Sequence, residues 1–346
     1  MYKNYKIYVN TAAGRRRYMQ YLIPYIVSCP LVDRYDIWIN THNGADIEYF
    51  KRIAEKFPVI NLIWQPDGVV DGNKSINAFY KQCVDEDAVY FKLDDDIVWM
   101  EPDAMEKMIR FRVDNPEYQV VSPLVINNSL STYLLQIEKK IYLDQYYNSE
   151  SSHPVLWKSP QFALELHNWF IDKIKEDAVS PLHMGVKAMG MTRFSINAIL
   201  WFGKDMAKIG GIVPGDDEEF MSCIWPTMTG RPNAWNADAV IAHFAFFTQR
   251  EILDQHSILE SYGELCKEQW KKYPELGKNA DTLNAILHDI DKEQASLMAN
   301  PSPYRKVAHP KTWKMKMKES MPKWMQAAWA GIYEYKHTTR NGFILK

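Results

Sequence analysis

The sequence predicts an α/β fold, in which a mostly parallel, twisted sheet carries helices on its faces. Short β-rich runs alternate with helical patterns through the first 120 residues, as in parallel sheets built from strand–helix–strand units. The composition, 47% hydrophobic and 24% charged over 346 residues, allows a large globular core. Three consecutive carboxylates, Asp94, Asp95 and Asp96, end one predicted strand. Ligands of such sheets bind at the carboxyl ends of the strands.

Four strands are expected in the first half, each rich in β-branched and aromatic residues. A helical pattern separates each strand from the next, and Pro24 interrupts the first of these patterns. The strands are expected at 5–10, 35–40, 59–65 and 88–94, and the helices at 15–29, 45–57 and 74–84.

The second half begins with a less regular stretch, 120–190, which is rich in Tyr, Trp and His. The segment "FSINAILWFGKDMAKIGGIVPGDDEEFM" then predicts a strand, a short helix ended by Gly210 and Gly211, an acidic turn and another helix. A β-like run at 234–247 carries one histidine, and 251–300 is helical in pattern.

We therefore expect residues 1–120 and 121–250 to form two halves of one domain, followed by a helical extension, 251–300, and a basic tail. The tail, 301–346, holds ten Lys or Arg against two Glu, a charge of +8 that leaves −10 for the rest of the chain.

The four cysteines are far apart and form no CxxC pair, so neither a zinc knuckle nor a disulfide framework is indicated. No apolar stretch approaches the ~20 residues that span a bilayer, and the N-terminus lacks an apolar leader. These features predict a cytoplasmic protein that meets membranes only from the surface.

The acidic triplet requires a positive partner, because neighbouring carboxylates oppose each other's ionisation. Side chains alternate along a strand, so Asp94 and Asp96 are expected to converge while Asp95 points elsewhere. Mg²⁺ and Mn²⁺ take oxygen ligands from one or two carboxylates together with substrate phosphates. The alternative is an acidic cap for the helix expected at 101–111.

Two further groups are candidates for chemistry. Asp217, in "PGDDEEF", is a possible general base for a hydroxyl nucleophile, although acidic residues also favour an ordinary helix N-terminus. His243 lies in the apolar run "VIAHFAFF", where a satisfied core histidine is the alternative to a ligand. Lys92 is a candidate to orient the triplet, with a water-facing strand residue as the alternative. Gln249 and Arg250 are candidates to close over phosphates, with a solvated loop as the equal alternative.

The order of these features resembles the GT-A glycosyltransferases, particularly the inverting family 2 type. A β-rich start, "LDDDI", then "AILWFGKDMAKIGGIVPGDDEEF" and finally "AHF" match that family's sequence of parts over roughly residues 5–250. The resemblance implies a GT-A fold, an aspartate-x-aspartate motif and Mn²⁺ or Mg²⁺. Two parts of the family pattern differ: "NTAAGRRR" replaces its Pro-x-x-Asn, and its Gln/Arg-x-x-Arg-Trp box is not evident.

The resemblance also implies roles for individual residues. Asp94, Asp96 and His243 become the metal ligands, and Asp217 becomes the catalytic base. The candidates for contact with the nucleotide-sugar are Thr11, Arg15, Lys74, Asn77, Asp94 and Asp95.

The function that follows is metal-dependent, inverting transfer of a sugar from a nucleoside-diphosphate donor, with UDP expected by family analogy. The acceptor is expected to be a glycan or a lipid-linked oligosaccharide of cell-surface polysaccharide biosynthesis. The alternatives are a sugar-1-phosphate nucleotidyltransferase, for which "TAAGRRR" is a poor phosphate loop, a retaining transferase, and a non-catalytic glycan-binding or membrane adaptor.

Aromatic residues suggest where the acceptor and a membrane bind. Trp157, Tyr146 and Tyr147 are candidates to stack on sugar rings, with a core role as the alternative. In the tail, Lys alternates with Trp and Met, a pattern that suits an anionic membrane surface or a helix docked on the protein body. Nucleic acid is not an expected partner, because no basic field extends into the catalytic half of the chain.

Overall fold

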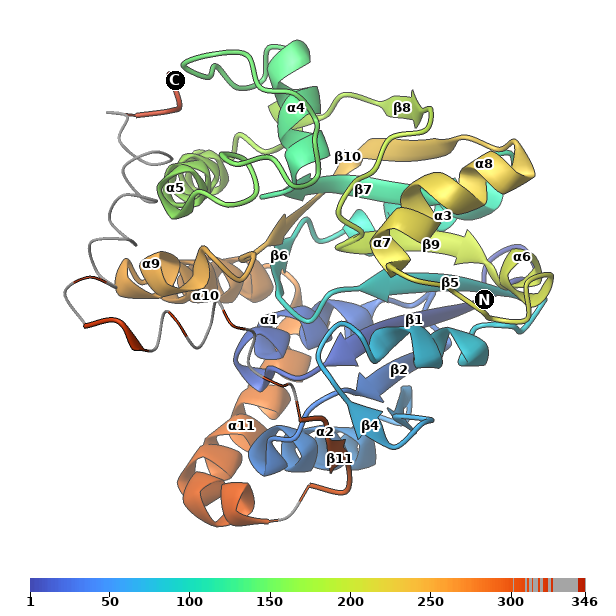
Figure 1. Ribbon diagram of the computed structural model, residues 1–346, viewed down its shortest axis with the longest axis vertical. Helices are drawn as coiled ribbons and strands as arrows, with labels where there is room; N and C mark the ends of the chain where they lie inside the picture. The colour runs from blue at the N-terminus through green and yellow to red at the C-terminus, as the bar shows by residue number, and fades with distance from the viewer. Residues whose placement is uncertain are drawn as a thin grey trace.

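The computed structural model describes residues 1–300, 302–308, 310, 313, 317, 320–322, 325 and 342–345. Its centre is a nine-stranded mixed sheet in the order β3-β2-β1-β5-β9-β7-β10-β6, with β8 paired to β10 (Figure 1). The strands of this sheet are β1 (Lys6–Ala13), β2 (Arg34–Ile39), β3 (Ile60–Trp64), β5 (Ala88–Leu93), β6 (Ile97–Met100), β7 (Val121–Ile126), β8 (Val186–Met189), β9 (Ala198–Phe202) and β10 (Asn233–His243). A separate two-stranded sheet pairs β4 (Val69–Val70) with β11 (Arg305–Lys306).

The expected α/β arrangement, mostly parallel with flanking helices and a helical C-terminal extension, is confirmed. Neighbouring strands are parallel from β3 through β5 and again between β7 and β10, while β9, β6 and β8 run against their neighbours. The larger helices are α1 (Arg16–Ser28), α2 (Gly44–Lys56), α3 (Ala104–Asp114), α4 (Ser129–Ile137), α5 (Pro160–Lys175), α10 (Ile258–Lys271) and α11 (Pro274–Ala299). The shorter ones are η1 (Ile76–Gln82), η2 (Ser180–Leu182), α6 (Gly203–Ala207), α7 (Asp217–Glu219), η3 (Phe220–Ile224), α8 (Trp225–Thr229) and α9 (Arg250–Gln255).

Side chains point alternately to the two faces of the sheet along each strand, and a buried core lies on each face. On β1, Ile7 and Val9 belong to one buried cluster and Tyr8 to the other. The first cluster packs under α1, α2, α3 and α10, and the second contains Trp38, Trp201 and the aromatic residues of η1. A sheet covered on both faces explains why its strands read as nearly continuous apolar runs.

Three element predictions needed correction. The helix expected at 74–84 is the 3-10 helix η1, because the Ser75 hydroxyl bonds Asn40 and Gly72 and does not cap the helix. The short buried run "IVWM" after the triplet forms β6, and α3 begins only at Ala104. The helix expected from the second acidic cluster is divided into α7, a π-helical turn and α8.

The helical extension packs back on the first half of the sheet. The long helix α11 contacts α1 and α2, so the chain returns to the edge of the sheet formed by β2 and β3 (Figure 1). Among the described residues, no helix combines the length and apolarity that a bilayer crossing needs. Most of the tail from 309 onward lies outside the described residues, so its membrane contact stays a prediction.

Candidate active site

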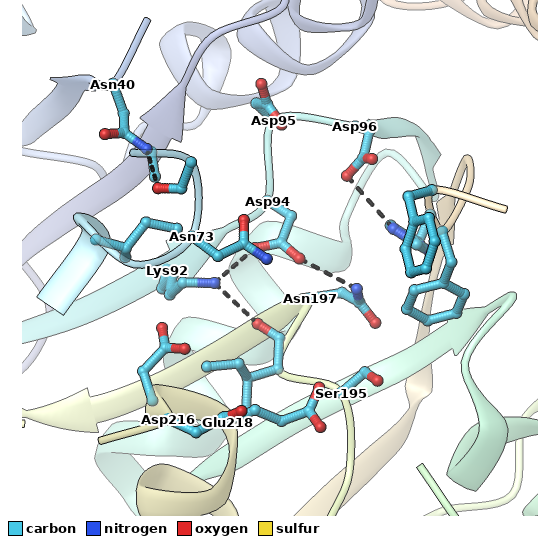
Figure 2. Close-up of a pocket in the computed structure, with 18 of the residues that line it drawn as sticks. Asn40, Asn73, Lys92, Asp94, Asp95, Asp96, Ser195, Asn197, Asp216 and Glu218 are labelled. Atoms are coloured by element: carbon cyan, nitrogen blue, oxygen red, sulfur yellow. Dashed lines mark hydrogen bonds and ion pairs between the residues drawn. The ribbon is translucent and has the colours of Figure 1, made fainter. Parts of the chain in front are cut away.

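A cavity of about 890 Å³ opens at the carboxyl ends of β1, β2 and β5. Its lining brings together the acidic triplet, the turn before α7, the end of β10 and an irregular segment around Trp157. Figure 2 shows Asp94 between Asp95 and Asp96 on one side and Asp216 and Glu218 on the other. Segments that are more than 100 residues apart in sequence thus meet at the edge where an α/β sheet binds its ligands.

The triplet forms the tight turn between β5 and β6. Ile97 N donates to Asp94 O at 3.4 Å, and Asp94 N donates to Asn197 O at 2.8 Å, just before β9. On the other side, Phe244 N donates to Asp96 O at 2.8 Å. The strand β6 separates the triplet from α3, so the triplet does not cap that helix. Backbone bonds to β9 and β10 fix the position of the acidic turn instead.

Asp94, Asp96 and His243 form the cluster that the sequence led us to expect. Each offers one ligand atom, and these atoms lie within 4.8 Å of one another. His243 Nδ1 lies 3.2 Å from Asn127 O, and a carbonyl can only accept, so Nδ1 carries a proton. His243 Nε2 faces Asp96 Oδ1 at 3.4 Å. This nitrogen can either donate to Asp96 or, when it carries no proton, offer its lone pair to a cation bound between the two side chains. The donor set therefore fits a divalent metal.

Side-chain cations also balance the triplet. Lys92, buried under the sheet end, donates to Asp94 Oδ1 at 2.5 Å. Arg15 Nη2 lies 3.0 Å from Asp96 Oδ2, and Arg250 Nη2 lies 3.7 Å from the same oxygen. Burial alone would raise the pKa of Asp96, but Arg15, then His243 and Arg250, outweigh it and hold that pKa well below its ordinary value. The carboxylate is thus charged and ready to bind a cation.

Asp95 is not part of the cluster of Asp94, Asp96 and His243. It accepts from Gly14 N at 3.0 Å and from the Arg15 guanidinium, which ties the triplet to the loop after β1. Burial raises the pKa of Asp95 above its ordinary value despite Arg15. The side chain lines the cavity, but its hydrogen bonds are used to hold Arg15.

Asp217 lies at the start of α7, in the same cavity as Asp94, Asp96 and His243. Its Oδ2 accepts from the Tyr80 hydroxyl at 3.1 Å. Burial raises the pKa of Asp217 above its ordinary range, against the opposing effects of Lys92 and Tyr80. Gly211, at φ +68°, allows this close fit, because a Cβ there would lie 2.6 Å from the Lys81 Cα of η1. A half-buried carboxylate of raised pKa, held by one donor, is suited to accept a proton.

The predicted nucleotide contacts are only partly brought together. Arg15, Lys74 and Asn77 line the cavity. Thr11 does not line the cavity. It lies on the same face of β1 as Ile7 and Val9, which belong to the core, and its side chain is fully buried. The expectation for Thr11 is therefore corrected, and Ala12 and Gly14 line the cavity in its place.

Asn77 and Gln249 both have structural roles. The Asn77 amide donates to Val213 O at 2.9 Å and to Gly215 O at 2.8 Å, and so holds the turn before Asp217. Gln249 is buried and bonds Asn127 and Trp157 O, so it braces the loops around His243 and does not face phosphates.

An aromatic wall completes the cavity on the side of the irregular segment. Trp157 lies with its ring centroid 5.6 Å from that of Phe246 and 5.4 Å from that of Phe247, and Phe247 is 67% exposed. Of the other candidates, Tyr147 is buried, and Tyr146 packs on Tyr133 outside the cavity lining. The sugar-stacking candidates are thereby reduced to Trp157.

Four site residues were missed from the sequence: Asn197, Arg193, Tyr80 and Phe247. Asn197 donates to Asp94 Oδ2 at 3.1 Å, and Arg193 pairs with Asp216 at 3.0 Å and Glu218 at 2.9 Å. The sequence offers two local signals for these residues. Asn197 comes directly before a β-like run, and Phe247 ends the aromatic stretch "HFAFF". Their roles depend on the antiparallel insertion of β9 and the pairing of β10.

No protein-family model matches the chain, and no curated protein matches its sequence. Among solved structures, glucosyl-3-phosphoglycerate synthase from Mycobacterium tuberculosis, in complex with Mn²⁺, uridine-diphosphate and phosphoglyceric acid, is 11% identical at a TM-score of 0.42. That match covers 76% of this chain and 79% of the synthase. CMP:2-keto-3-deoxy-manno-octonic acid synthetase complexed with CTP is 10% identical at a TM-score of 0.40, over 74% of this chain and 98% of the synthetase. The 4-diphosphocytidyl-2C-methyl-D-erythritol synthase from Anaerococcus prevotii is 11% identical at a TM-score of 0.38. That match covers 74% of this chain and 96% of the synthase. Scores below 0.5 assign neither fold family nor activity.

Proposed function

We propose that this protein is a metal-dependent, inverting glycosyltransferase of the GT-A type. The observation that carries the proposal is the meeting of two acidic groups in one cavity. The cluster of Asp94, Asp96 and His243 lines the same cavity as Asp217, which is held by Tyr80 and comes from a separate part of the chain. Glycosyl transfer from a nucleoside-diphosphate sugar needs both a charge-neutralising site for the leaving group and a separate base.

Asp94, Asp96 and His243 are the residues that would hold Mn²⁺ or Mg²⁺. A divalent ion held there would supply positive charge that stabilises the departing diphosphate. The protein adds its own cations on the same side of the cavity, because Arg15 and Arg250 flank Asp96. Lys92 and Asn197 fix Asp94 by one oxygen each, so the carboxylate is oriented before any ligand arrives.

Asp217 is the proposed base. The acceptor hydroxyl forms its bond to the anomeric carbon as the bond from that carbon to the diphosphate oxygen breaks, and Asp217 takes the hydroxyl proton. The raised pKa of Asp217 strengthens it as a proton acceptor, and Tyr80 keeps its carboxylate oriented. General base catalysis of this kind contributes on the order of 100- to 10,000-fold in rate.

The two halves of the sheet divide the substrates between them. We assign the nucleotide-sugar donor, with UDP as the nucleotide, to residues 1–120, and the glycan or lipid-linked acceptor to residues 121–250 with the aromatic wall. We further propose that the basic aromatic tail, 301–346, meets the anionic inner face of the plasma membrane, which suits an acceptor of cell-surface polysaccharide synthesis.

A sugar-1-phosphate nucleotidyltransferase is the second candidate, and the position of Arg15 favours it. Arg15 follows β1 and lines the cavity, where such enzymes place a basic phosphate loop. Its guanidinium is engaged by Asp95 and Asp96, however, and that leaves it less free for a triphosphate. The two activities differ in their products, since a nucleotidyltransferase releases pyrophosphate from a nucleoside triphosphate and a glycosyltransferase releases a nucleoside diphosphate.

The test is a panel of nucleotide sugars with Mn²⁺, read first as thermal stabilisation and then as nucleoside diphosphate release with candidate acceptors. We expect one or more donors to raise the melting temperature only when metal is present. In Asp96→Asn a proposed metal ligand is lost, so the rise in melting temperature that the donor causes with Mn²⁺, measured against the variant's own lower baseline, should disappear. If no nucleotide sugar binds with or without metal, the proposal is wrong, and pyrophosphate release from a nucleoside triphosphate would favour the second candidate.

A further inference from the structure

A short segment after α11 returns to the donor side of the cavity. Residues 302–307, here called the strap, run past the ends of β2 and β3, and β11 within the strap pairs in parallel with β4 (Figure 1). Arg305 N donates to Gly68 O at 3.0 Å. The strap is separated from β2 and β3 by more than 230 residues in sequence, yet it contacts the last residue of β2 and the residue after β3.

Tyr304 is the anchor of the strap. Its hydroxyl donates to Ile39 O at 3.0 Å and accepts from Gln65 N at 3.1 Å, so it joins the last residue of β2 to the residue after β3. The side chain is only 8% exposed, and its ring packs near Trp64 and His42. The hydroxyl therefore both donates and accepts a hydrogen bond inside the protein.

From Tyr304, a chain of hydrogen bonds leads to the cavity. Gln65 Nε2 donates to Ser75 O at 2.9 Å, and Ser75 Oγ donates to Asn40 Oδ1 at 2.8 Å. Asn40 Nδ2 then donates to Gly72 O at 2.9 Å. Asn40 and Gly72 both line the cavity. The strap is thus connected to the cavity wall through directional contacts, buried at Gln65, partly buried at Ser75 and exposed at the last link between Asn40 and Gly72.

A second tie runs through His42. Its Nε2 lies 3.2 Å from Val70 O, a pure acceptor, so Nε2 donates and Nδ1 accepts from the Ser302 hydroxyl at 2.9 Å. The loop from Gln65 to Ser75 contains only the two-residue strand β4, which is too short to hold a shape alone. Its conformation depends on partners outside the loop, and the strap supplies several of them.

We infer that the strap positions the wall that receives the nucleoside end of the donor. This inference rests on the proposed function, in which Asp94, Asp96 and His243 fix the diphosphate. The sugar lies toward Asp217 in that arrangement, so the nucleoside extends toward the other end of the cavity. We assign the nucleoside to the part of the lining that comes from the loop after β1, the end of β2 and the 72–74 turn, which is Ala12, Asn40, Thr41, Gly72, Asn73 and Lys74. Tyr304 touches no substrate in this assignment and acts as a positioning residue through Gln65 and Asn40.

The test uses Tyr304→Phe in the full chain, because this variant keeps the ring and removes both hydrogen bonds. We expect faster amide hydrogen exchange across residues 65–75 and UDP affinity, measured with Mn²⁺, that is weaker by about 3- to 30-fold. The value of kcat at saturating donor should stay within about twofold, because the acidic cluster and Asp217 are unchanged. Tyr273→Phe is the matched control, since Tyr273 is 45% exposed and lies outside the cavity lining.

The two readouts separate failure of the strap from failure of the proposed function. Unchanged exchange across 65–75 in Tyr304→Phe overturns the inference, whether or not the protein binds UDP. Faster exchange with wild-type UDP affinity also overturns it, because the loop is then not the nucleoside wall. A wild-type protein that binds no nucleotide at all removes the proposed function, and with it the nucleoside assignment.

Discussion

Arg15 Nη2 lies 3.0 Å from Asp96 Oδ2, although the two residues stand on different loops 81 positions apart. The same guanidinium contacts Asp95, so one arginine joins two of the three triplet carboxylates. The like charges that seemed to require a metal are thus balanced partly by the protein itself. A metal at Asp94, Asp96 and His243 has to bind beside Arg15, and the two cations influence each other's binding.

Replacing Arg15 by Ala should therefore destabilise the protein and strengthen its response to metal. Asp95 and Asp96 are buried, and loss of one partner of a buried pair costs about 3 kcal/mol in the free energy of unfolding. Mn²⁺ can restore part of that charge balance, so the rise in melting temperature with Mn²⁺ should be larger in Arg15→Ala than in wild type. Thermal unfolding with and without Mn²⁺ measures both effects. Arg17→Ala, which removes an exposed pair with Asp254, should lose less than about 1 kcal/mol and keep the wild-type metal response.

Asp217→Asn should separate donor binding from transfer. The amide keeps the size of the side chain and can still meet Tyr80, but it cannot take a proton. We expect UDP and Mn²⁺ affinity within about threefold of wild type and a loss of about 100- to 10,000-fold in kcat. Asp216→Asn serves as the comparison, because Asp216 caps α7 and pairs with Arg193 at the surface. Unchanged turnover in Asp217→Asn would remove Asp217 from the base role.

The pH dependence of the reaction should respond to Tyr80. The Tyr80 hydroxyl donates to Asp217 and lowers its pKa, while burial raises it. Activity requires the carboxylate form, so the rate falls as the pH drops through the pKa of Asp217. In Tyr80→Phe that pKa rises further, and the acidic limb of kcat/KM should move to higher pH with little change on the alkaline side. A limb that stays in place, or moves to lower pH, contradicts the assignment of Asp217 as the titrating base.

Local pattern was sufficient for the first parallel strands of the sheet and for the acidic cluster. The strands at 5–10, 35–40 and 88–94 have strong β-branched and aromatic patterns, and period-two alternation predicted that Asp94 and Asp96 point together. The roles of Asn197 and Tyr80 could not be read in this way. Asn197 reaches Asp94 only because β9 inserts antiparallel beside β5, and Tyr80 reaches Asp217 because Gly211 lets the chain approach η1. The burial of Thr11 follows from the same alternation, but it required the exact register of β1.

The aromatic wall gives a prediction for acceptor binding. Phe247 is 67% exposed at the cavity rim beside Trp157, so Phe247→Ala should leave stability and UDP affinity nearly unchanged. If stacking on the acceptor sugar contributes as much as a typical aromatic contact, about 0.5–1.5 kcal/mol, the acceptor KM should rise by about 2- to 12-fold at a similar kcat. Tyr146→Ala is a matched control, because Tyr146 is equally exposed but lies outside the cavity lining. Initial rates at saturating donor over a range of acceptor concentrations measure the effect. An equal rise in acceptor KM for both variants would mean that surface apolarity, and not the wall, determines acceptor binding.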